Sequence, residues 1–411
     1  MQSTPKALRL HIGLFGRRNV GKSSLLNAIT RQQVSIVSEF AGTTTDPVEK
    51  PMELLPLGPV QFVDTAGVDD EGALGALRIA RTKAIFERVD LGVIVTEADA
   101  WGAFEEALFA ELKGRNVPIL VVFNKQDLNH VTREEQTALE TRGAAVVAVS
   151  AATGAGVLDL REALLKLAPG DFFENRRLVS DLVPPGEIAV LVVPIDKEAP
   201  KGRLILPQVM TIRDLLDGES MSVVCQEREL KHALASLAKP PALVVTDSQA
   251  FLKVAADVPK GVPMTSFSIL MARFQGDLVE QVRGTMGIEK LKGGDTVLIA
   301  ETCSHHPVGE DIGRVKIPRW LTQYVGAKVN FANVQGRDFP QDLSPYQLIV
   351  HCGNCTGNRR EMLSRLHRCK EAGVPMTNYG LTIAYSLGIF ERALAPFPAA
   401  LAVDQELKAA K

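Results

Sequence analysis

Apolar residues along this chain are concentrated in short runs of strand length, and glycine, proline or polar residues follow most of them. Such runs predict strands, and the clearest lie at residues 8–15, 119–123, 145–149, 188–195, 221–225, 242–245, 295–300, 328–334 and 346–350. Stretches with helical spacing lie between them, at residues 24–30, 209–216, 228–237, 248–256, 267–273 and 358–372. Strands that alternate with helices predict an α/β fold with parallel sheets.

The connections between these elements divide the chain into three predicted domains. Stretches rich in proline and glycine at residues 167–170 and 184–186 mark a connector after the first domain. We therefore predict α/β domains at residues 1–170, 171–262 and 263–411. The middle domain carries no catalytic set of residues, and Asp214, Asp217 and Glu219 are interpreted as a solvated face. A domain of this kind often mediates association, so we expect a homodimer joined through it.

Composition and charge exclude several classes of protein. The chain has 411 residues and a net charge of −2, which speaks against nucleic-acid binding. No apolar run approaches the ~20 residues of a membrane helix, and residues 1–9 lack the apolar segment of a signal peptide. Five cysteines are too few for a disulfide scaffold, so we expect a cytoplasmic protein with reduced thiols. Cys225 and Cys369 are interpreted as small apolar core residues.

A phosphate-binding motif follows the first predicted strand. The sequence at residues 16–23 fits G-x-x-x-x-G-K-[ST] and lies between a strand and a helix, as this motif requires. Its backbone N–H groups and the helix N-terminus would surround phosphate oxygens, and Lys22 would neutralise their charge. The residues expected to contact the phosphates are Gly16, Arg17, Arg18, Asn19, Val20, Gly21, Lys22, Ser23 and Ser24.

Two later motifs predict a magnesium ion and a hydrolytic reaction. Thr44 lies in a G-T-T-T-D stretch, where a first switch loop is expected, and D-T-A-G at residues 64–67 follows an apolar strand. Mg²⁺ would be held by Ser23, by Thr44 and, through water, by Asp64, while the N–H of Gly67 would meet the γ-phosphate. The predicted catalytic residues are Lys22, Thr44, Asp64 and Gly67.

The remaining motifs of the first domain predict specificity for guanine. Asn124, Lys125 and Asp127 form N-K-x-D after a buried strand, and Ser150 and Ala151 follow the next strand. A carboxylate at Asp127 can accept both the N1 and N2 protons of guanine, which adenine does not offer. Motifs in this order resemble the G-domain of translation-factor-class GTPases, so we expect GTP as the ligand.

Two details indicate the type of G-domain. Val68 stands where Ras-like proteins carry a catalytic glutamine, and an apolar side chain cannot orient the attacking water. Asn19 matches the asparagine with which GTPases that resemble the tRNA-modification enzyme MnmE hold a potassium ion near the phosphates. A cation there would stabilise charge in the transition state, so we expect slow hydrolysis stimulated by K⁺. The alternative is that Asn19 only stabilises the loop.

Metal-binding residues gather in the last domain. Cys303 and His305 follow one predicted strand, and His351, Cys352 and Cys355 follow another. Because parallel strands end at one edge of a sheet, these residues are expected to converge. Three interpretations compete: a disulfide between Cys352 and Cys355, a structural zinc ion, and an iron–sulfur cluster with three thiolates.

The whole chain resembles HydF, the family of FeFe-hydrogenase maturation GTPases. The resemblance rests on A-G-T-T-T-D-P at residues 41–47, on the three-domain order, and on C-x-H…H-C-x-x-C. It implies a 4Fe-4S cluster on Cys303, Cys352 and Cys355, with His305 or His351 at an exchangeable fourth position. Asn354 stands at a variable position of the motif where a second glycine is common, and it removes no ligand.

The resemblance also implies a function. The protein would be a scaffold that receives a diiron precursor made with the radical-SAM maturases HydE and HydG and delivers it to apo FeFe-hydrogenase. GTP hydrolysis would act as a timing switch. The alternative hypothesis is a ribosome- or tRNA-associated GTPase with a structural zinc domain.

Overall fold

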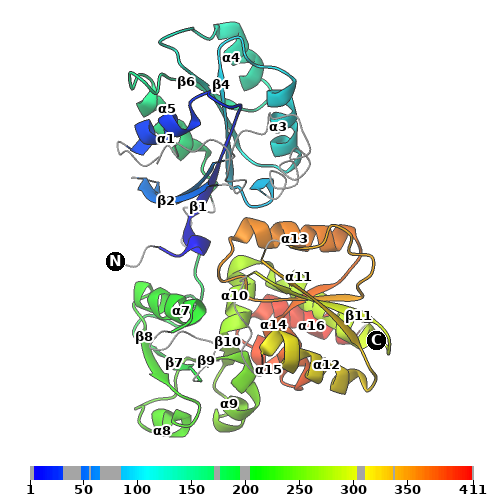
Figure 1. Cartoon of the computed structure of the whole chain (residues 1–411). Helices are drawn as coiled ribbons and strands as arrows, with labels where there is room; N and C mark the ends of the chain where they lie inside the picture. The colour runs from blue at the N-terminus through cyan, green and yellow to red at the C-terminus, as the bar shows by residue number, and fades with distance from the viewer. Residues whose placement is uncertain are drawn as a thin grey trace. The chain divides into compact units, whose positions relative to one another are not determined.

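The structure is a computed structural model that describes residues 4–30, 48–54, 57–64, 85–170, 176–194, 204–302, 311–336 and 338–409. It separates into two compact units, Met1–Asn175 and Arg176–Lys411 (Figure 1). Both units are built from strands that alternate with helices, so the predicted α/β class is confirmed. None of the described helices is long and apolar enough to cross a membrane.

A six-stranded sheet forms the centre of the first unit, in the order β2-β3-β1-β4-β5-β6. Its neighbouring strands are parallel except for the β2–β3 pair. The strands are β1 (Leu10–Phe15), β2 (Val48–Leu54), β3 (Gly58–Asp64), β4 (Leu91–Glu97), β5 (Ile119–Asn124) and β6 (Ala145–Ala148). The helices are η1 (Lys6–Leu8), α1 (Lys22–Thr30), α3 (Ala103–Gly114), α4 (Arg133–Glu140) and α5 (Val157–Leu167).

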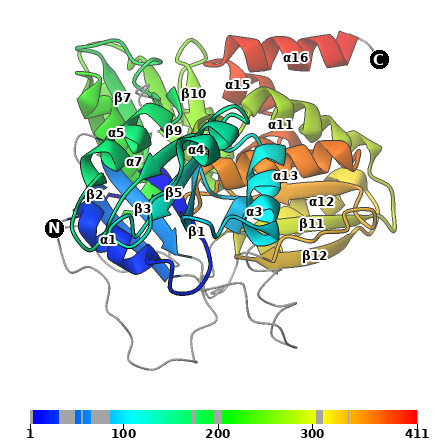
Figure 2. The same cartoon turned by 90° about the horizontal axis from the view of Figure 1, so that it is seen from above.

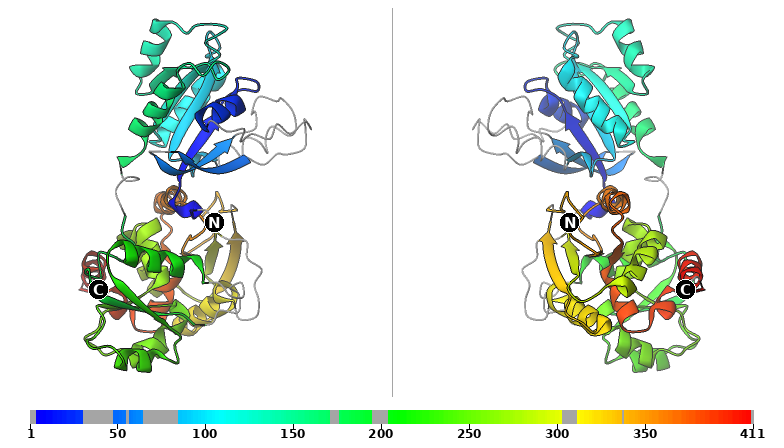
Figure 3. Two further views of the ribbon diagram at one scale, coloured as in Figure 1. Left: turned by 90° about the vertical axis from the view of Figure 1, so that its left-hand side faces the viewer. Right: turned by 90° about the vertical axis from the view of Figure 1, so that its right-hand side faces the viewer.

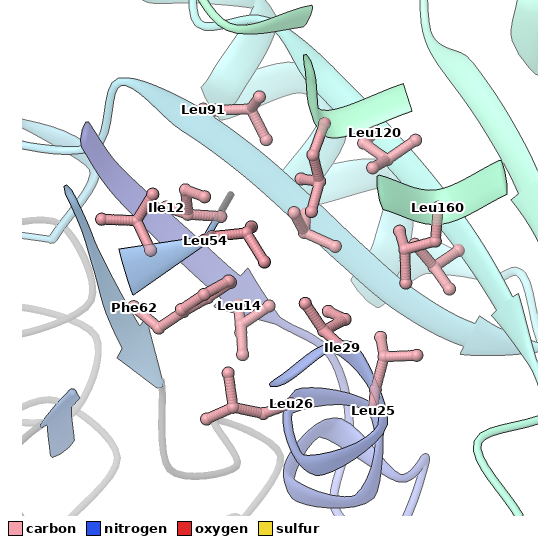
Figure 4. Close-up of a cluster of buried hydrophobic side chains, with 14 of the residues drawn as sticks. Ile12, Leu14, Leu25, Leu26, Ile29, Leu54, Phe62, Leu91, Leu120 and Leu160 are labelled. Atoms are coloured by element: carbon pink, nitrogen blue, oxygen red, sulfur yellow. The ribbon is translucent and has the colours of Figure 1, made fainter. Parts of the chain in front are cut away.

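Both faces of this sheet are buried. Ile12 and Leu14 of β1 pack with Leu26 of α1 in one core cluster (Figure 4). Phe15, on the other face of the same strand, packs with residues of α3 and α4 in a second cluster. The helices therefore lie in two layers, α1 and α5 on one face and α3 and α4 on the other (Figure 2). Full burial of each such side chain contributes about 1.5–3 kcal/mol to folding stability. This packing holds in place the strand ends from which the site is built.

The second unit begins with a four-stranded parallel sheet, in the order β10-β9-β7-β8. Its strands are β7 (Ile188–Val192), β8 (Met221–Cys225), β9 (Leu243–Thr246) and β10 (Met264–Ser266). Its helices are α7 (Leu206–Asp217), α8 (Leu230–Ala235), η2 (Ser248–Ala250) and α9 (Phe251–Asp257). Strand β8 lies at the edge of this sheet and exposes Met221 and Val224 by 51% and 46%.

The interpretation of Asp214 as part of a solvated face was wrong. Its carboxylate accepts the backbone N–H groups of Val179 and Ser180 at 2.8 and 2.7 Å. These contacts tie helix α7 to the chain that enters the sheet. Of the two cysteines outside the metal motif, Cys369 is a core residue at 1% exposure, as predicted, whereas Cys225 is only half-buried.

The last part of the chain forms a second parallel sheet, in the order β12-β11-β13-β14 (Figure 3). The strands are β11 (Thr296–Glu301), β12 (Asn330–Gln335), β13 (Leu348–His351) and β14 (Met376–Asn378). The helices are α10 (Phe267–Gln275), α11 (Leu278–Thr285), η3 (Met286–Lys290), η4 (Ile312–Lys316), α12 (Ile317–Val325), α13 (Arg359–Glu371), α14 (Tyr379–Ser386), α15 (Phe390–Leu394) and α16 (Pro398–Ala409). Met362, Leu366 and Cys369 of α13 pack on the sheet. This packing places α13 directly against the strand that ends at His351.

Candidate functional sites

The loop after β1 has the backbone of a phosphate-binding loop. Gly16, Asn19 and Gly21 adopt φ values of 146°, 64° and 91°, in the left-handed region that favours glycine. A Cβ atom at Gly16 would lie 2.3 Å from the carbonyl oxygen of Val95. A Cβ atom at Gly21 would lie 2.3 Å from Nδ2 of Asn124. Both glycines are therefore required by close approach as well as by backbone conformation.

Lys22 begins helix α1, and Asp64 ends strand β3. The ammonium of Lys22, which is buried, donates to the carbonyl oxygens of Gly16 and Arg17 at 2.8 and 2.7 Å. Asp64 ends β3 and pairs in register with Leu14 of β1. Burial raises the pKa of Asp64 against the opposing effect of Lys22, and its buried Oδ1 has no hydrogen-bond partner among the described residues. This oxygen fits the predicted role of accepting from water on Mg²⁺.

Asn124 joins the two ends of the predicted nucleotide site. Its Nδ2 donates to the carbonyl oxygen of Val20 at 2.9 Å, and its Oδ1 accepts the N–H of Ala151 at 3.0 Å. The hydroxyl of Ser150 donates to Asp127 Oδ1 at 2.5 Å. The phosphate loop, the N-K-x-D motif and the loop after β6 are thus held together by side-chain hydrogen bonds.

These loops enclose a pocket. Its volume is about 500 Å³, which suits a nucleoside, and the residues that line it are Gly21, Ser24, Asn27, Ala28, Asn124, Lys125, Asp127, Leu128, Ala151 and Ala152. One wall is fixed by the ion pair between Lys125 and Glu97, with Nζ and Oε1 2.6 Å apart. Residues of the phosphate motif and of the guanine motifs therefore line one pocket.

Four of the predicted residues are exposed to solvent, and others lie outside the described residues. Arg18, Asn19, Ser23 and Ser24 are exposed to solvent on the loop and at the start of α1. Arg17 instead holds a buried carboxylate of α3 through its guanidinium. Thr44 and Gly67, predicted to act on the γ-phosphate, lie outside the described residues, as does Val68.

In the last domain, the loop after β13 carries two of the predicted thiolates. Cys352 and Cys355 are both half-buried and are not joined in a disulfide, so the disulfide interpretation is not supported. The backbone N–H of Thr302, just after β11, donates to Sγ of Cys352 at 3.2 Å, and its hydroxyl lies 3.5 Å from the same sulfur. The thiolate is the form of cysteine that binds metal. Cys303 and His305 lie outside the described residues.

Asn354 fixes the shape of this loop. It adopts φ 54° and is 1% exposed. Its Oδ1 accepts the hydroxyl of Thr302 at 2.9 Å, and its Nδ2 donates to the carbonyl oxygen of Asn358 at 2.9 Å. The left-handed backbone explains why glycine suits this position, and the two hydrogen bonds show what asparagine adds.

Both ring nitrogens of His351 form hydrogen bonds within the protein. Nε2 lies 2.8 Å from Nη1 of Arg365, and Nδ1 lies 2.8 Å from the carbonyl oxygen of Cys352. Burial, with the nearby positive charge of Arg365, lowers the pKa of His351 to about 3, so its ring is neutral at pH 7. In this arrangement His351 has no nitrogen left for an iron ion, which disagrees with its place among the predicted fourth ligands.

A buried polar pair beside this loop was not predicted as a pair. Tyr379, after β14, donates to Oε1 of Glu301 at 2.9 Å, and Gln335 donates to its Oε2 at 3.1 Å. Gly313 allows the approach, because a Cβ atom there would lie 2.2 Å from the Tyr379 hydroxyl. The only signal in the sequence was that polar residues follow each of these strands.

The two described thiols fit a metal cluster in their chemistry, although the full ligand set is not described. Among the described residues, no three side chains of His, Cys, Asp or Glu come together as a metal site. The carboxyl ends of β11 and β13 are nonetheless adjacent, with Ala300 paired to His351. Cys303 follows β11 by two residues in the sequence and lies outside the described residues.

The sheet, the phosphate loop and the guanine motifs define a P-loop GTPase domain, and a family model described as 50S ribosome-binding GTPase matches residues 11–125. The second unit matches two further family models. The hydrogen maturase F dimerization domain matches residues 178–276, and the hydrogen maturase F tetramerization domain matches residues 279–396. These two models together span more than half of the chain, which therefore belongs to the hydrogen maturase F family.

Several curated proteins match about two fifths of this chain. The tRNA modification GTPase MnmE of Heliobacterium modesticaldum is 35% identical over 161 residues, which cover 38% of this chain and 34% of that protein. MnmE of Bordetella avium is 40% identical over 161 residues, covering 39% and 34%. The chain thus spans about a third of the length of these relatives. A crystal structure of an Era variant from Aquifex aeolicus bound to GDP·AlF4− is 21% identical, with a TM-score of 0.35, and covers 53% of this chain and 93% of that one.

Proposed function

We propose that this GTPase is a scaffold that binds a 4Fe-4S cluster on Cys303, Cys352 and Cys355. It would receive a diiron precursor from the radical-SAM maturases HydE and HydG and deliver it to apo FeFe-hydrogenase. The observation that carries the proposal is the loop after β13, where Cys352 and Cys355 are half-buried and the sulfur of Cys352 accepts the N–H of Thr302 at 3.2 Å. Membership of the hydrogen maturase F family supports it. A cytoplasmic location would keep these thiols reduced.

The division of the chain into residues 1–170, 171–262 and 263–411 assigns a separate task to each domain in this proposal. The first domain binds and hydrolyses GTP, the second joins two chains, and the third holds the cluster. The exposed edge strand β8 and the match to a dimerization domain support the second assignment. The middle sheet continues slightly beyond residue 262, because β10 (Met264–Ser266) pairs with β9.

The decisive experiment is iron and sulfide analysis after anaerobic reconstitution, with EPR of the reduced protein. The wild-type protein should hold about four irons per chain and give a 4Fe-4S signal. Cys352→Ser and Cys355→Ser should lose the cluster and hydrogenase maturation but keep GTP hydrolysis. Cys225→Ser is the matched control, because this half-buried cysteine lies in the other sheet, and it should keep both. A protein that holds only zinc and gives no EPR signal would contradict the proposal.

The GTPase reaction is proposed to be slow and stimulated by K⁺. Bound Mg²⁺ would supply charge to the phosphates, with the hydroxyl of Ser23 and the buried carboxylate of Asp64 holding it. The backbone amides of the loop and Lys22 would orient the phosphates. Asn19 supports a potassium site, because its φ of 64° and its exposure leave its side chain outside the core. Steady-state hydrolysis in KCl and NaCl tests this, and Asn19→Ala should abolish the difference. Equal rates for the wild-type protein in both salts would contradict it.

A further inference from the structure

Arg365 is a buried cation next to the loop that carries Cys352 and Cys355. It lies on α13 and is 4% exposed. Its Nη1 lies 2.8 Å from Nε2 of His351, and its Nη2 donates to Oε1 of Glu361 at 2.7 Å and to the carbonyl oxygen of Gly336 at 3.0 Å. Its guanidinium also lies over the ring of Phe339, 5.0 Å from the centroid. A guanidinium with this many partners has one well-defined position.

This position determines where the proton of His351 lies. An arginine is always a donor, so Nε2 of His351 must accept its hydrogen bond and cannot carry the proton. The proton of the neutral ring is then on Nδ1, which donates to the carbonyl oxygen of Cys352 at 2.8 Å. A chain of hydrogen bonds therefore leads from Arg365 through His351 to the backbone carbonyl of Cys352.

A second set of hydrogen bonds fixes the other end of the loop to the same helix. Asn354 donates to the carbonyl oxygen of Asn358, and the side chain of Asn358 caps α13 by accepting the N–H of Glu361 at 3.1 Å. Glu361 in turn pairs with Arg365. The loop that carries Cys352 and Cys355 is thus anchored at both ends by residues of α13, and Arg365 is common to both routes.

We propose that Arg365 is a positioning residue for the cluster, which acts through His351 to fix the Cys352 backbone, and that His351 is a buried link and not an iron ligand. The inference rests on the proposed cluster site. Under this proposal, the fourth ligand of the cluster is a group that does not come from β13. Outer-shell residues of this kind typically change metal affinity about 10- to 100-fold when they are lost.

The first test uses the metal-free protein. Histidine ¹⁵N chemical shifts of the wild-type chain should show His351 with its proton on Nδ1. Arg365→Met keeps an unbranched side chain but removes every donor, so it should shift His351 toward a mixture of tautomers and speed amide exchange at residues 351–358. A wild-type His351 with its proton on Nε2 would overturn the proposal, and this result does not depend on whether any variant folds.

The second test uses the reconstituted protein and a matched control. Arg368 lies on the same helix and over the same Phe339 ring, at 5.2 Å, and donates to the carbonyl oxygen of Pro340. Arg365→Met should retain iron against a chelator about 10- to 100-fold less tightly and change the EPR g values, whereas Arg368→Met should do neither. Both variants should keep wild-type GTP hydrolysis, which reports that the first unit is folded.

The same measurements distinguish a failure of the proposed function from a failure of this inference alone. A wild-type protein that takes up no cluster would overturn the proposed function and this inference together. A wild-type protein with a cluster, and an Arg365→Met protein with the same iron retention and g values, would overturn the inference alone. Pulsed EPR of ¹⁵N-histidine protein adds a direct check: a cluster-bound nitrogen that disappears in His351→Gln would show that His351 is a ligand.

Discussion

The guanidinium of Arg17 forms a two-point ion pair with the carboxylate of Glu105. Nε and Nη2 of Arg17 lie 2.9 Å from Oε1 and Oε2 of Glu105. The glutamate is fully buried in the first turn of α3, and its Oε2 also accepts the N–H of Gly102 at 3.0 Å. Arg17, which stands at a variable position of the motif, therefore fixes the phosphate loop to α3.

We expect Arg17→Ala to destabilise the protein more than Glu105→Gln does. The first change leaves a buried carboxylate without its cation, whereas the second removes the charge and keeps an oxygen for Gly102. Urea unfolding should show a loss of about 1–3 kcal/mol for Arg17→Ala. Arg18→Ala, at an exposed neighbour, should lie within about 0.5 kcal/mol of wild type. The reverse order of the first two variants would show that the ion pair does not stabilise the loop.

A buried histidine in β1 makes stability depend on pH. Burial lowers the pKa of His11 to about 3, from an ordinary value near 6.5. Because the unfolded chain binds this proton more readily, the stabilising contribution is complete above pH 6.5 and is lost as the pH falls toward 3. His11→Gln should reduce the slope of unfolding free energy in that range by up to about 1.4 kcal/mol per pH unit.

Urea unfolding at a series of pH values measures this slope. His130→Gln, at an exposed position, is the control and should leave it unchanged. His351 titrates in the same range and remains in both variants, so some dependence on pH should persist. A His11→Gln protein with the wild-type slope would be inconsistent with a buried neutral His11.

The edge strand β8 gives a test of dimerisation. Val224→Lys places a charge on this strand, where the wild-type side chain is 46% exposed and apolar. If two copies meet here, the dissociation constant should rise about tenfold or more, which is about 1.4 kcal/mol. Leu252→Lys, at a 53% exposed apolar residue of α9, should leave it unchanged. Analytical ultracentrifugation measures both, and an unchanged Val224→Lys dimer would place the interface elsewhere.

Substitutions at Asn354 separate backbone conformation from hydrogen bonding. Asn354→Gly tolerates φ 54° but loses two side-chain hydrogen bonds, so it should cost about 1–3 kcal/mol. Asn354→Val loses the same bonds and adds about 1–2 kcal/mol of backbone strain. Iron retention should fall in the same order. Equal losses in urea unfolding would mean that the left-handed backbone is not maintained.

Lys22→Ala tests the independence of the GTP and cluster sites. The ammonium crosses the phosphate loop and is the main positive charge available to the β- and γ-phosphates. Titration with a fluorescent GTP analogue should show at least about tenfold weaker binding, because a charge-assisted contact contributes about 1.5–3 kcal/mol. The iron content after reconstitution should equal that of the wild-type protein. Loss of iron together with nucleotide binding would show that the sites are coupled.

The sequence predicted the strands with continuous apolar runs well. Strands β1, β5, β7 and β8 were found within a few residues, because apolar side chains on both faces of a parallel strand leave a clear pattern. Strand β2 gave no such pattern: it contains Pro51, alternates charged residues with apolar ones, and lies at the sheet edge. A three-residue strand such as β10 is too short for any period to be recognised.

The residues of the functional sites also differ in how well the sequence predicts them. The P-loop and guanine residues were predictable because their spacing along the chain fixes their positions around one ligand. Arg365 was not, because it is one of several arginines on a polar helix, and only the fold selects it. His351 was proposed as a ligand from its neighbours in sequence, yet it is the last residue of β13, and Cys352 already belongs to the loop that follows. Its ring faces α13, and the sulfur of Cys352 faces Thr302.

The exposed apolar edge of β8 has a consequence for handling the protein. A strand that ends a sheet presents backbone donors and acceptors to any other strand, and nonpolar side chains on it add a driving force. A chain that has lost its partner through dilution would therefore be prone to self-aggregation. At the same total concentration, a variant with a weakened dimer should therefore precipitate sooner than the wild-type protein.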